Sequence, residues 1–194
     1  MITVTTPAPP VRELPEAFRP LRSVEFQRLV DLGLFEGTHV ELVGGVLVEM
    51  SPQGPLHNTV LRRMNRVLVL AAGDAFEVGV QVPLDVDDIT LPEPDFTIVP
   101  AGRFTDRHPD AAVLIVEVAV TSGRFDLGEK ARRYGAAGFG EYWVVDLDRR
   151  CVHVHRDPSP DGWGSVVRHT AGELAATAVP GLVIDVADVL SVAG

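Results

Sequence analysis

The sequence contains a single cysteine, Cys151, among its 194 residues. One cysteine cannot form an intrachain disulfide, so the fold does not depend on an oxidising compartment. No uncharged apolar run approaches the roughly twenty residues that a membrane-spanning helix needs. The first residues also lack the basic segment and apolar core that mark a secretory signal peptide. These absences predict a cytoplasmic protein that does not cross a membrane.

Positive charge is also scarce, since 17 lysines and arginines face 27 aspartates and glutamates, for a net charge of −10. A protein of this charge repels a polyanion at long range, because nucleic-acid binding depends on clustered basic side chains. Two modest basic clusters occur, Arg62–Arg63–Arg66 and Lys130–Arg132–Arg133. Any contact with DNA is therefore expected to be local and salt-sensitive, and bound metal could neutralise part of the negative charge.

The composition is that of an ordinary globular protein, with 46% apolar and 23% charged residues. A chain of this length can bury about 70% of its unfolded-state surface, so it needs no disulfide or structural metal to fold. Residues 1–22 contain five prolines and little periodicity. We therefore predict an extended N-terminal arm over residues 1–22 and a single domain over residues 23–194.

Hydrophobic periodicity predicts alternating helices and strands along the domain. Helices are expected over 23–34, 56–72 and 126–138, a tight hairpin over 40–48 around two glycines, and strands over 76–82, 95–99, 111–120, 141–147, 151–156 and 162–169. A short strand and a helical turn are expected over 181–190. This order predicts an α/β fold with a mixed central sheet flanked by helices and extra C-terminal strands.

Residues 91–130 carry the chemistry that stands out. Asp95 and Glu117 are acids that lie in two apolar runs, LPEPDFTIVP and AAVLIVEVAV. Burying a carboxylate is costly unless it has a partner such as a cation. The segment TSGRFDLGEK then begins a helix, with Asp126 as the expected N-cap, and delivers Lys130. Two acids and a lysine are the minimum set for metal-assisted hydrolysis of a phosphodiester.

Alternation along the strand gives these residues a geometry. Glu117 shares a strand face with Ile115 and Ala119, so a lysine at position 119 would lie beside its carboxylate. That position holds Ala119 instead. Lys130, one turn into the following helix, can lie over the same face, and Asp95 can reach it if the two strands pair.

Pro94–Asp95 followed by Glu117–Val118–Ala119 resembles the PD-(D/E)XK nuclease signature with its lysine moved. Further segments are similar to one branch of that superfamily, the small bacterial putative restriction endonuclease family. They are VELVGGVLVEMSP with His57 after it, LPEPDFTIV, LIVEVAVTSGRFDLGEKARRYGAAGFGEYWVVD and CVHVHR. The resemblance covers roughly residues 22–190. The family often has a Ser-Pro pair after the strand glutamate, which this sequence lacks.

The resemblance implies a restriction-endonuclease-like core and a metal-dependent endonuclease acting on DNA. Asp95 and Glu117 would bind Mg²⁺, or Mn²⁺ in its place, with help from the Val118 carbonyl. Lys130 would orient the attacking water or stabilise charge on the phosphate, and Glu41 matches a further acidic position of the family pocket. By analogy with such nucleases, a homodimer is expected to address two strands.

Less specific interpretations stand beside these. Nuclease folds exist without activity, so the chain could be a catalytically inactive binding or assembly module. Asp126 and Lys130 are spaced as a surface helix ion pair, and Asp95 could be a turn acid. Glu41 could be an exposed hairpin residue, and His57 either a surface histidine or a phosphate contact. Three arginines of the helix over 56–72 suggest a solvated face: Arg62, Arg63 and Arg66. Two aromatics, Tyr134 and Trp143, are expected in the core.

A second metal hypothesis comes from His153–Val154–His155, which places two imidazoles on one strand face. This pair resembles the His-x-His ligands of a cupin-type barrel. The predicted helices argue against a pure barrel, and no third ligand is clearly spaced. The alternative is an ordinary exposed strand face.

Overall fold

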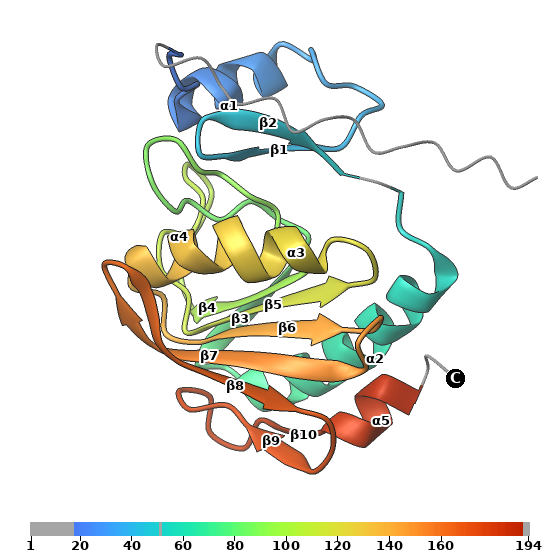
Figure 1. Ribbon diagram of the computed structural model, residues 1–194. Helices are drawn as coiled ribbons and strands as arrows, with labels where there is room; N and C mark the ends of the chain where they lie inside the picture. The colour runs from blue at the N-terminus through green and yellow to red at the C-terminus, as the bar shows by residue number, and fades with distance from the viewer. Residues whose placement is uncertain (1–17, 51, 192–194) are drawn as a thin grey trace, which may run out of the picture.

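The computed structural model describes residues 18–50 and 52–191. At its centre lies a six-stranded sheet in the order β3–β4–β5–β6–β7–β8 (Figure 1). The strands are β3 (Phe76–Val80), β4 (Phe96–Pro100), β5 (Leu114–Ala119), β6 (Tyr142–Asp146), β7 (Cys151–Ser159) and β8 (Gly162–His169). Within this sheet β5 and β6 run parallel and all other neighbours are antiparallel. The prediction of a mixed sheet is confirmed.

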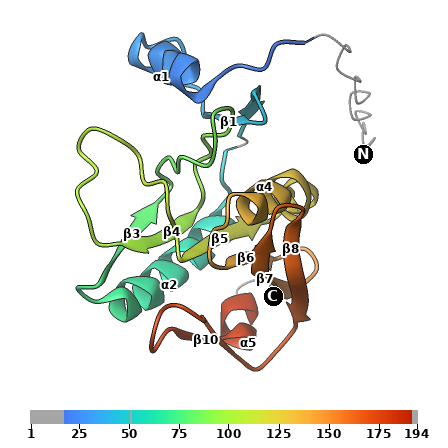
Figure 2. The ribbon, with the colours of Figure 1, turned by 90° about the vertical axis from the view of Figure 1, so that its left-hand side faces the viewer.

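Helices cover both faces of the sheet. Figures 1 and 2 show α3 and α4 over one face and α2 and α5 against the other, with α1 and a β-hairpin beyond α4. Their bounds are α1 (Ser23–Asp31), α2 (Pro55–Ala72), α3 (Gly123–Phe125), α4 (Ala131–Ala136) and α5 (Val186–Leu190). Between α3 and α4 lies one π-helical turn, η1 (Asp126–Lys130). None of the helices in the described part of the chain is both long and apolar enough to cross a membrane.

The longest helix, α2, follows the predicted spacing. Its buried face includes Val60, Leu61, Met64 and Leu68, which pack in one core with α5 and the sheet. Pro55 occupies the first turn, where a missing backbone N–H costs nothing.

All six residues of β5 are buried, as expected for a central strand covered on both faces. Leu114, Val116 and Val118 point into the core with α2. Ile115 and Ala119 point into the second core, which includes residues of α4. Alternation therefore turns the side chain of Glu117 toward the α4 side of the sheet.

The hairpin of β1 (Val40–Val43) and β2 (Val46–Glu49) carries Glu41 to the same region. Gly44 and Gly45 have φ angles of 64° and 75°, which a tight two-residue hairpin turn requires. Leu42 bridges to Leu91, and both pack with Phe26 of α1. The hairpin is thereby attached to the segment that leads into β4.

Two expectations about local structure were wrong. Helix α1 ends at Asp31 rather than near residue 34, and Arg22 rather than Ser23 is its N-cap. Val30 and Leu34, predicted to share the buried face with Phe26, are exposed. The helix packs through little more than Phe26, so no core holds a further turn before Gly33 takes a positive φ. Most of the predicted arm, residues 1–17, lies outside the described residues.

A small second sheet of β9 (Glu173–Ala175) and β10 (Val183–Asp185) follows the main sheet. It agrees with the predicted extra C-terminal strands, although β9 was not foreseen. Leu174 and Ile184 join the core under α2. The two short strands therefore cover part of the sheet face that packs against α2, opposite the face that carries Glu117.

Candidate functional site

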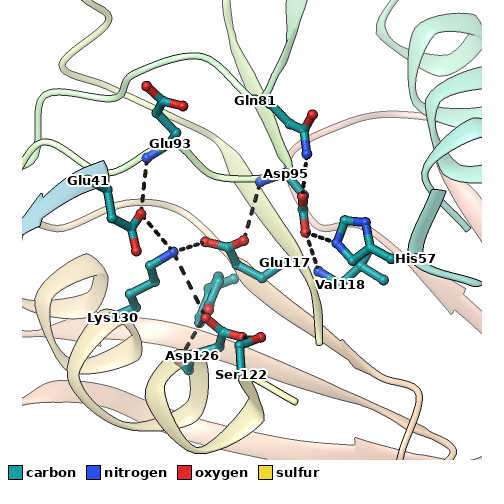
Figure 3. A network of polar contacts seen from close by, with 11 residues as sticks. Glu41, His57, Gln81, Glu93, Asp95, Glu117, Val118, Ser122, Asp126 and Lys130 are labelled. Atoms are coloured by element: carbon teal, nitrogen blue, oxygen red, sulfur yellow. Dashed lines mark hydrogen bonds and ion pairs between the residues drawn. The ribbon is translucent and has the colours of Figure 1, made fainter. Parts of the chain in front are cut away.

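The structure brings together the four side chains singled out in the sequence (Figure 3). Lys130 Nζ lies 2.9 Å from Glu117 Oε1 and 3.0 Å from Glu41 Oε2. Asp95 immediately precedes β4, and its backbone N–H donates to Glu117 Oε2 at 3.3 Å. Strand, hairpin and helix thus each contribute to one polar cluster.

This cluster is almost completely withdrawn from solvent. The exposed fractions are 6% for Asp95, 5% for Glu117, 4% for Lys130 and 2% for Glu41. The interpretation of Glu41 as an exposed hairpin residue is therefore wrong, and Asp95, at the bend before β4, is buried rather than exposed. The ion pair of Asp126 and Lys130 is not a surface pair either, since Asp126 is also buried.

The carboxylate of Asp95 contacts three polar groups. Its Oδ2 accepts the Val118 N–H at 2.8 Å and lies 3.1 Å from His57 Nε2, while Oδ1 accepts Gln81 Nε2 at 3.1 Å. The N–H and C=O of one strand residue point to the same neighbouring strand. The Val118 carbonyl is therefore directed to the side of β5 on which Asp95 lies.

His57 is not the surface histidine that one interpretation suggested. It comes from the first turn of α2, is 7% exposed, and leaves its Nδ1 buried without a hydrogen-bond partner. A buried polar atom without a partner is unusual in a native fold. The other histidine nitrogen holds the Asp95 carboxylate, so His57 belongs to the cluster.

Gln81 was not singled out by the sequence. Its φ of 51° is a conformation that residues other than glycine rarely adopt. Such strain persists where the surroundings enforce it, often at functional sites. Its backbone N–H donates to the carbonyls of Pro94 and Asp95, and its amide reaches the Asp95 carboxylate. No feature of the alternating strand pattern around residue 81 signalled this role.

Asp126 is placed differently from its prediction as an N-cap. The helical segment already begins at Gly123, and Asp126 opens the π-helical turn η1. Its carboxylate accepts the Ser122 hydroxyl at 2.5 Å and lies 4.0 Å from Lys130 Nζ. A π-helical turn widens the helix locally and often marks a functional site. Here both its first and its last residue face the cluster.

The cluster contains more negative than positive charge. Glu41, Glu117 and Asp126 surround Lys130, which is the only lysine of the chain. Burial raises the pKa of Glu117 well above its usual range, against the lowering effect of Lys130. Burial also raises the pKa of Asp126, again against Lys130.

The ammonium of Lys130 stays charged in this environment. Burial alone would lower its pKa, but the negative groups around it, Glu117 foremost, raise the pKa well above its usual value. A buried cation held by several carboxylates is fixed in position. The surplus of acids over cations leaves the cluster suited to a further cation.

Other buried acids of the sheet are balanced individually. Glu141 lies 2.7 Å from Arg156 Nη2 and also accepts the Trp143 indole N–H. Asp146 pairs with Arg149 at 2.8 Å. Each has its own arginine, whereas the acids around Lys130 share one cation. The predicted core positions of Tyr134 and Trp143 are confirmed, since both are fully buried.

The basic clusters do not form a broad anionic-ligand surface. Arg63 is bound to Asp188 of α5, while Arg62 and Arg66 are exposed on α2. Arg132 and Arg133 both pair with Glu129. The interpretation of the α2 arginines as a solvated face holds for Arg62 and Arg66, and Arg63 instead ties α2 to the C-terminal helix.

The His153–His155 pair does not form the ligand set of a cupin. His155 is 3% exposed, packs against the rings of Tyr142 and Trp163, and its Nδ1 lies 3.2 Å from the Tyr142 carbonyl. His153 instead approaches Cys151. The two imidazoles thus have separate environments.

His155 predicts a pH dependence of stability. Burial lowers its pKa to about 4, from about 6.5 in an unfolded chain. The unfolded state therefore binds more protons between these values, so stability falls as the pH drops from about 6.5 to 4. Allowing for solvent screening, we expect about 2 kcal/mol from this group.

Urea unfolding of the wild type and of His155→Phe at pH 7 and at pH 5 measures this contribution. The phenyl ring retains the packing on Tyr142 and Trp163 but cannot take up a proton. The loss on acidification should be smaller in His155→Phe; equal losses in both proteins would show that His155 does not titrate as described.

Comparisons with known proteins agree with this architecture. Residues 24–187 match the Uma2 family, described as "Putative restriction endonuclease". The structure is similar to the crystal structure of a putative nuclease belonging to DUF820 from Anabaena variabilis ATCC 29413, with a TM-score of 0.73 at 14% identity, over 90% of this chain and 100% of that one. A comparison with curated protein sequences found no match. At 14% identity, the similarity to the solved structure supports the fold alone.

Proposed function

Because the chain belongs to the Uma2 family of putative restriction endonucleases, we propose that it is an endonuclease that hydrolyses DNA phosphodiester bonds with Mg²⁺, or with Mn²⁺ in its place. The observation that carries this proposal is the convergence of Asp95, Glu117 and Lys130 in one buried cluster in which acids outnumber cations. Such a cluster is costly to maintain for stability alone.

The donor set fits a hard divalent cation. Mg²⁺ prefers carboxylate and carbonyl oxygens and keeps several of its waters. Asp95 and Glu117 would bind it, joined by the carbonyl of Val118, whose N–H already contacts Asp95. Asp95 Oδ1 and both carboxylate oxygens of Glu117 each have one polar partner, so each keeps a second lone pair for an ion.

When bound, the ion would supply positive charge at a phosphate oxygen and lower the pKa of a water molecule. Lys130 would hold that water, or a non-bridging phosphate oxygen, through the ammonium protons that now reach Glu117 and Glu41. Glu41 keeps the ammonium charged and fixes its position from the hairpin. His57 and Gln81 orient the Asp95 carboxylate from the other side.

The charge of the protein limits how DNA would be held. With a net charge of −10, the surface as a whole repels the phosphate backbone. Contacts would therefore be few and close to the metal, and affinity would fall steeply with salt. Part of the same proposal is a homodimer in the cytoplasm, with two sites addressing two strands.

The second candidate is a nuclease-fold protein that binds or assembles without cleaving. The observation in its favour is that Lys130 already has two carboxylate partners within about hydrogen-bond distance and that the cluster is nearly closed to solvent. Lys130 would then be a structural counter-ion. Metal binding separates the two candidates, because only the nuclease needs a divalent cation.

Calorimetric titration with Mn²⁺ provides this test. The wild type is expected to bind Mn²⁺ at millimolar concentration or below, and Asp95→Asn to lose that binding, because the amide removes the anionic oxygen. Asp148→Asn, at an exposed turn acid, should bind like the wild type. If the wild type gives no binding at millimolar Mn²⁺, or if Asp95→Asn binds as well, the second candidate is favoured.

A further inference from the structure

Three metal-ligating side chains meet on the hairpin between β6 and β7, apart from the site around Lys130. In the register of this hairpin, Asp146 is paired with Cys151, and Val144 with His153. Paired residues project to one face of the sheet, and residues two apart on a strand share a face. Asp146, Cys151 and His153 therefore point to the same side, the side covered by α3 and α4.

The distances bring these groups within reach of one ion. A carboxylate oxygen of Asp146, the Cys151 sulfur and a nitrogen of His153 all lie within 4.8 Å of one another. Cys151 Sγ is 3.3 Å from His153 Nε2. Asp146 and Cys151 are buried, and His153 is half-buried. The three donors are a carboxylate oxygen, a thiol sulfur and an imidazole nitrogen.

We propose that Asp146, Cys151 and His153 bind a zinc-class transition-metal ion, with water as the fourth ligand. Proteins bind zinc through these same donors in tetrahedral geometry, with the ion about 2.0–2.3 Å from each ligand atom. The three ligand atoms lie within 4.8 Å of one another, so a single ion placed between them is within reach of all three. The thiol releases its proton to solvent as the ion binds.

Arg149 would compete with a metal ion for the Asp146 carboxylate. Its Nη1 lies 2.8 Å from Asp146 Oδ2, but its side chain is 56% exposed and can turn into water. Because the guanidinium is solvated, its departure from Asp146 leaves no buried cation without a partner. The Arg149 backbone N–H separately donates to Asp146 Oδ1 at 2.8 Å. That hydrogen bond keeps the carboxylate oriented when the guanidinium leaves.

The site has space and a path to solvent. An open cavity of about 330 Å³ borders Asp146, Arg149 and Gly123. A Cβ added at Gly123 would come within 3.4 Å of Asp146 Oδ2, so this glycine leaves the carboxylate accessible from α3. The fourth, water ligand can occupy the side of the ion that faces this cavity.

This ion would be distinct from the proposed catalytic one. Glu117 pairs with Val144, and Val144 with His153, so two strand spacings separate Glu117 from His153. That separation is about 10 Å, whereas paired catalytic metals lie about 3.5–4 Å apart. The ion would instead tie β6 to β7 beneath α3. The proposal of this second ion does not depend on the proposed nuclease activity.

Cobalt binding tests this site, because Cys151 is the only cysteine of the chain. Adding Co²⁺ to the reduced full-length protein at neutral pH should produce the near-ultraviolet charge-transfer band of a cobalt thiolate and the visible bands of tetrahedral Co²⁺. Zn²⁺ should then displace Co²⁺ and abolish the bands. Zn²⁺ should also raise the midpoint of thermal unfolding.

The variants make the assignment specific. Cys151→Ser should remove the charge-transfer band, and Asp146→Asn or His153→Gln should weaken binding roughly 100-fold, since each removes one of three protein ligands. Asp148→Asn, next in the turn, and Glu117→Gln, in the other cluster, should leave the band unchanged. A wild type without the band, or one whose affinity survives Asp146→Asn and His153→Gln, would overturn the proposal.

Discussion

Replacing Asp95 with asparagine is expected to lower the rate of DNA cleavage in Mg²⁺ at least about 1000-fold, which corresponds to about 4 kcal/mol of transition-state stabilisation. The substitution keeps the shape of the side chain and the Val118 N–H donor can still reach an amide oxygen. What it removes is the negative charge that would hold the ion. Cleavage of supercoiled plasmid, followed over time with Mg²⁺ or Mn²⁺, measures the effect.

The comparison needs a matched acid that lies outside the cluster. Asp148→Asn, purified identically, changes the net charge by the same amount at an exposed turn and should cleave like the wild type. Thermal unfolding of both variants shows whether each is folded. Equal cleavage by wild type and Asp95→Asn on plasmid, linear duplex and single-stranded DNA would contradict the assignment of Asp95.

Replacing Lys130 with methionine is expected to abolish cleavage and also to destabilise the fold by about 3 kcal/mol. Removing one member of a buried ion pair typically costs about 3–5 kcal/mol, because the remaining charge is left without a partner. Glu41 and Glu117 would both lose their cation. The expected loss is at the lower end, since Glu117, whose pKa burial already raises, can take up a proton.

A second substitution separates the loss of cleavage from the loss of stability. Adding Glu41→Gln to Lys130→Met removes one of the stranded acids, so urea unfolding should show that part of the lost stability returns. Cleavage should not return, because the ammonium is still missing. Recovery of cleavage in the double variant would mean that Lys130 acts only as a structural counter-ion.

Strand alternation was sufficient to orient Glu117. A single acid within the most apolar run of the chain had to face one side of a covered sheet, and the residues on either side of it indicated which neighbours it would share. The pairing of β4 with β5 then brought Asp95 to Glu117 as expected. The resemblance added Glu41, which no local pattern connects to residues more than fifty positions away.

The rest of the cluster depends on tertiary structure. His57 lies at the start of a helix, where a histidine is usually exposed, and it is buried only because the start of α2 lies against Asp95. Asp126 has the sequence of an N-cap, yet the helical segment begins three residues earlier and a π-helical turn rotates it inward. Neither the register of a helix start nor an irregular turn is encoded in hydrophobic periodicity.

The metal hypothesis for the histidine pair illustrates the same limit. The sequence placed His153 and His155 on one face correctly, but it could not show that the face changes character along β7. Near Tyr142 the strand packs against aromatic rings, whereas Cys151 and His153 lie close to the Asp146 carboxylate. The partner of His153 is thus Cys151, two residues away in the opposite direction.

The central claim is that a divalent cation binds beside Lys130, and the chain offers one direct probe of it. Because Lys130 is the only lysine, protein labelled with ¹³C at lysine Cε gives a single lysine signal in an NMR spectrum. Paramagnetic Mn²⁺ bound by Asp95 and Glu117 should broaden that signal beyond detection in the wild type and leave it sharp in Asp95→Asn. A signal that stays sharp in the wild type at millimolar Mn²⁺, or broadens equally in both proteins, would contradict the account.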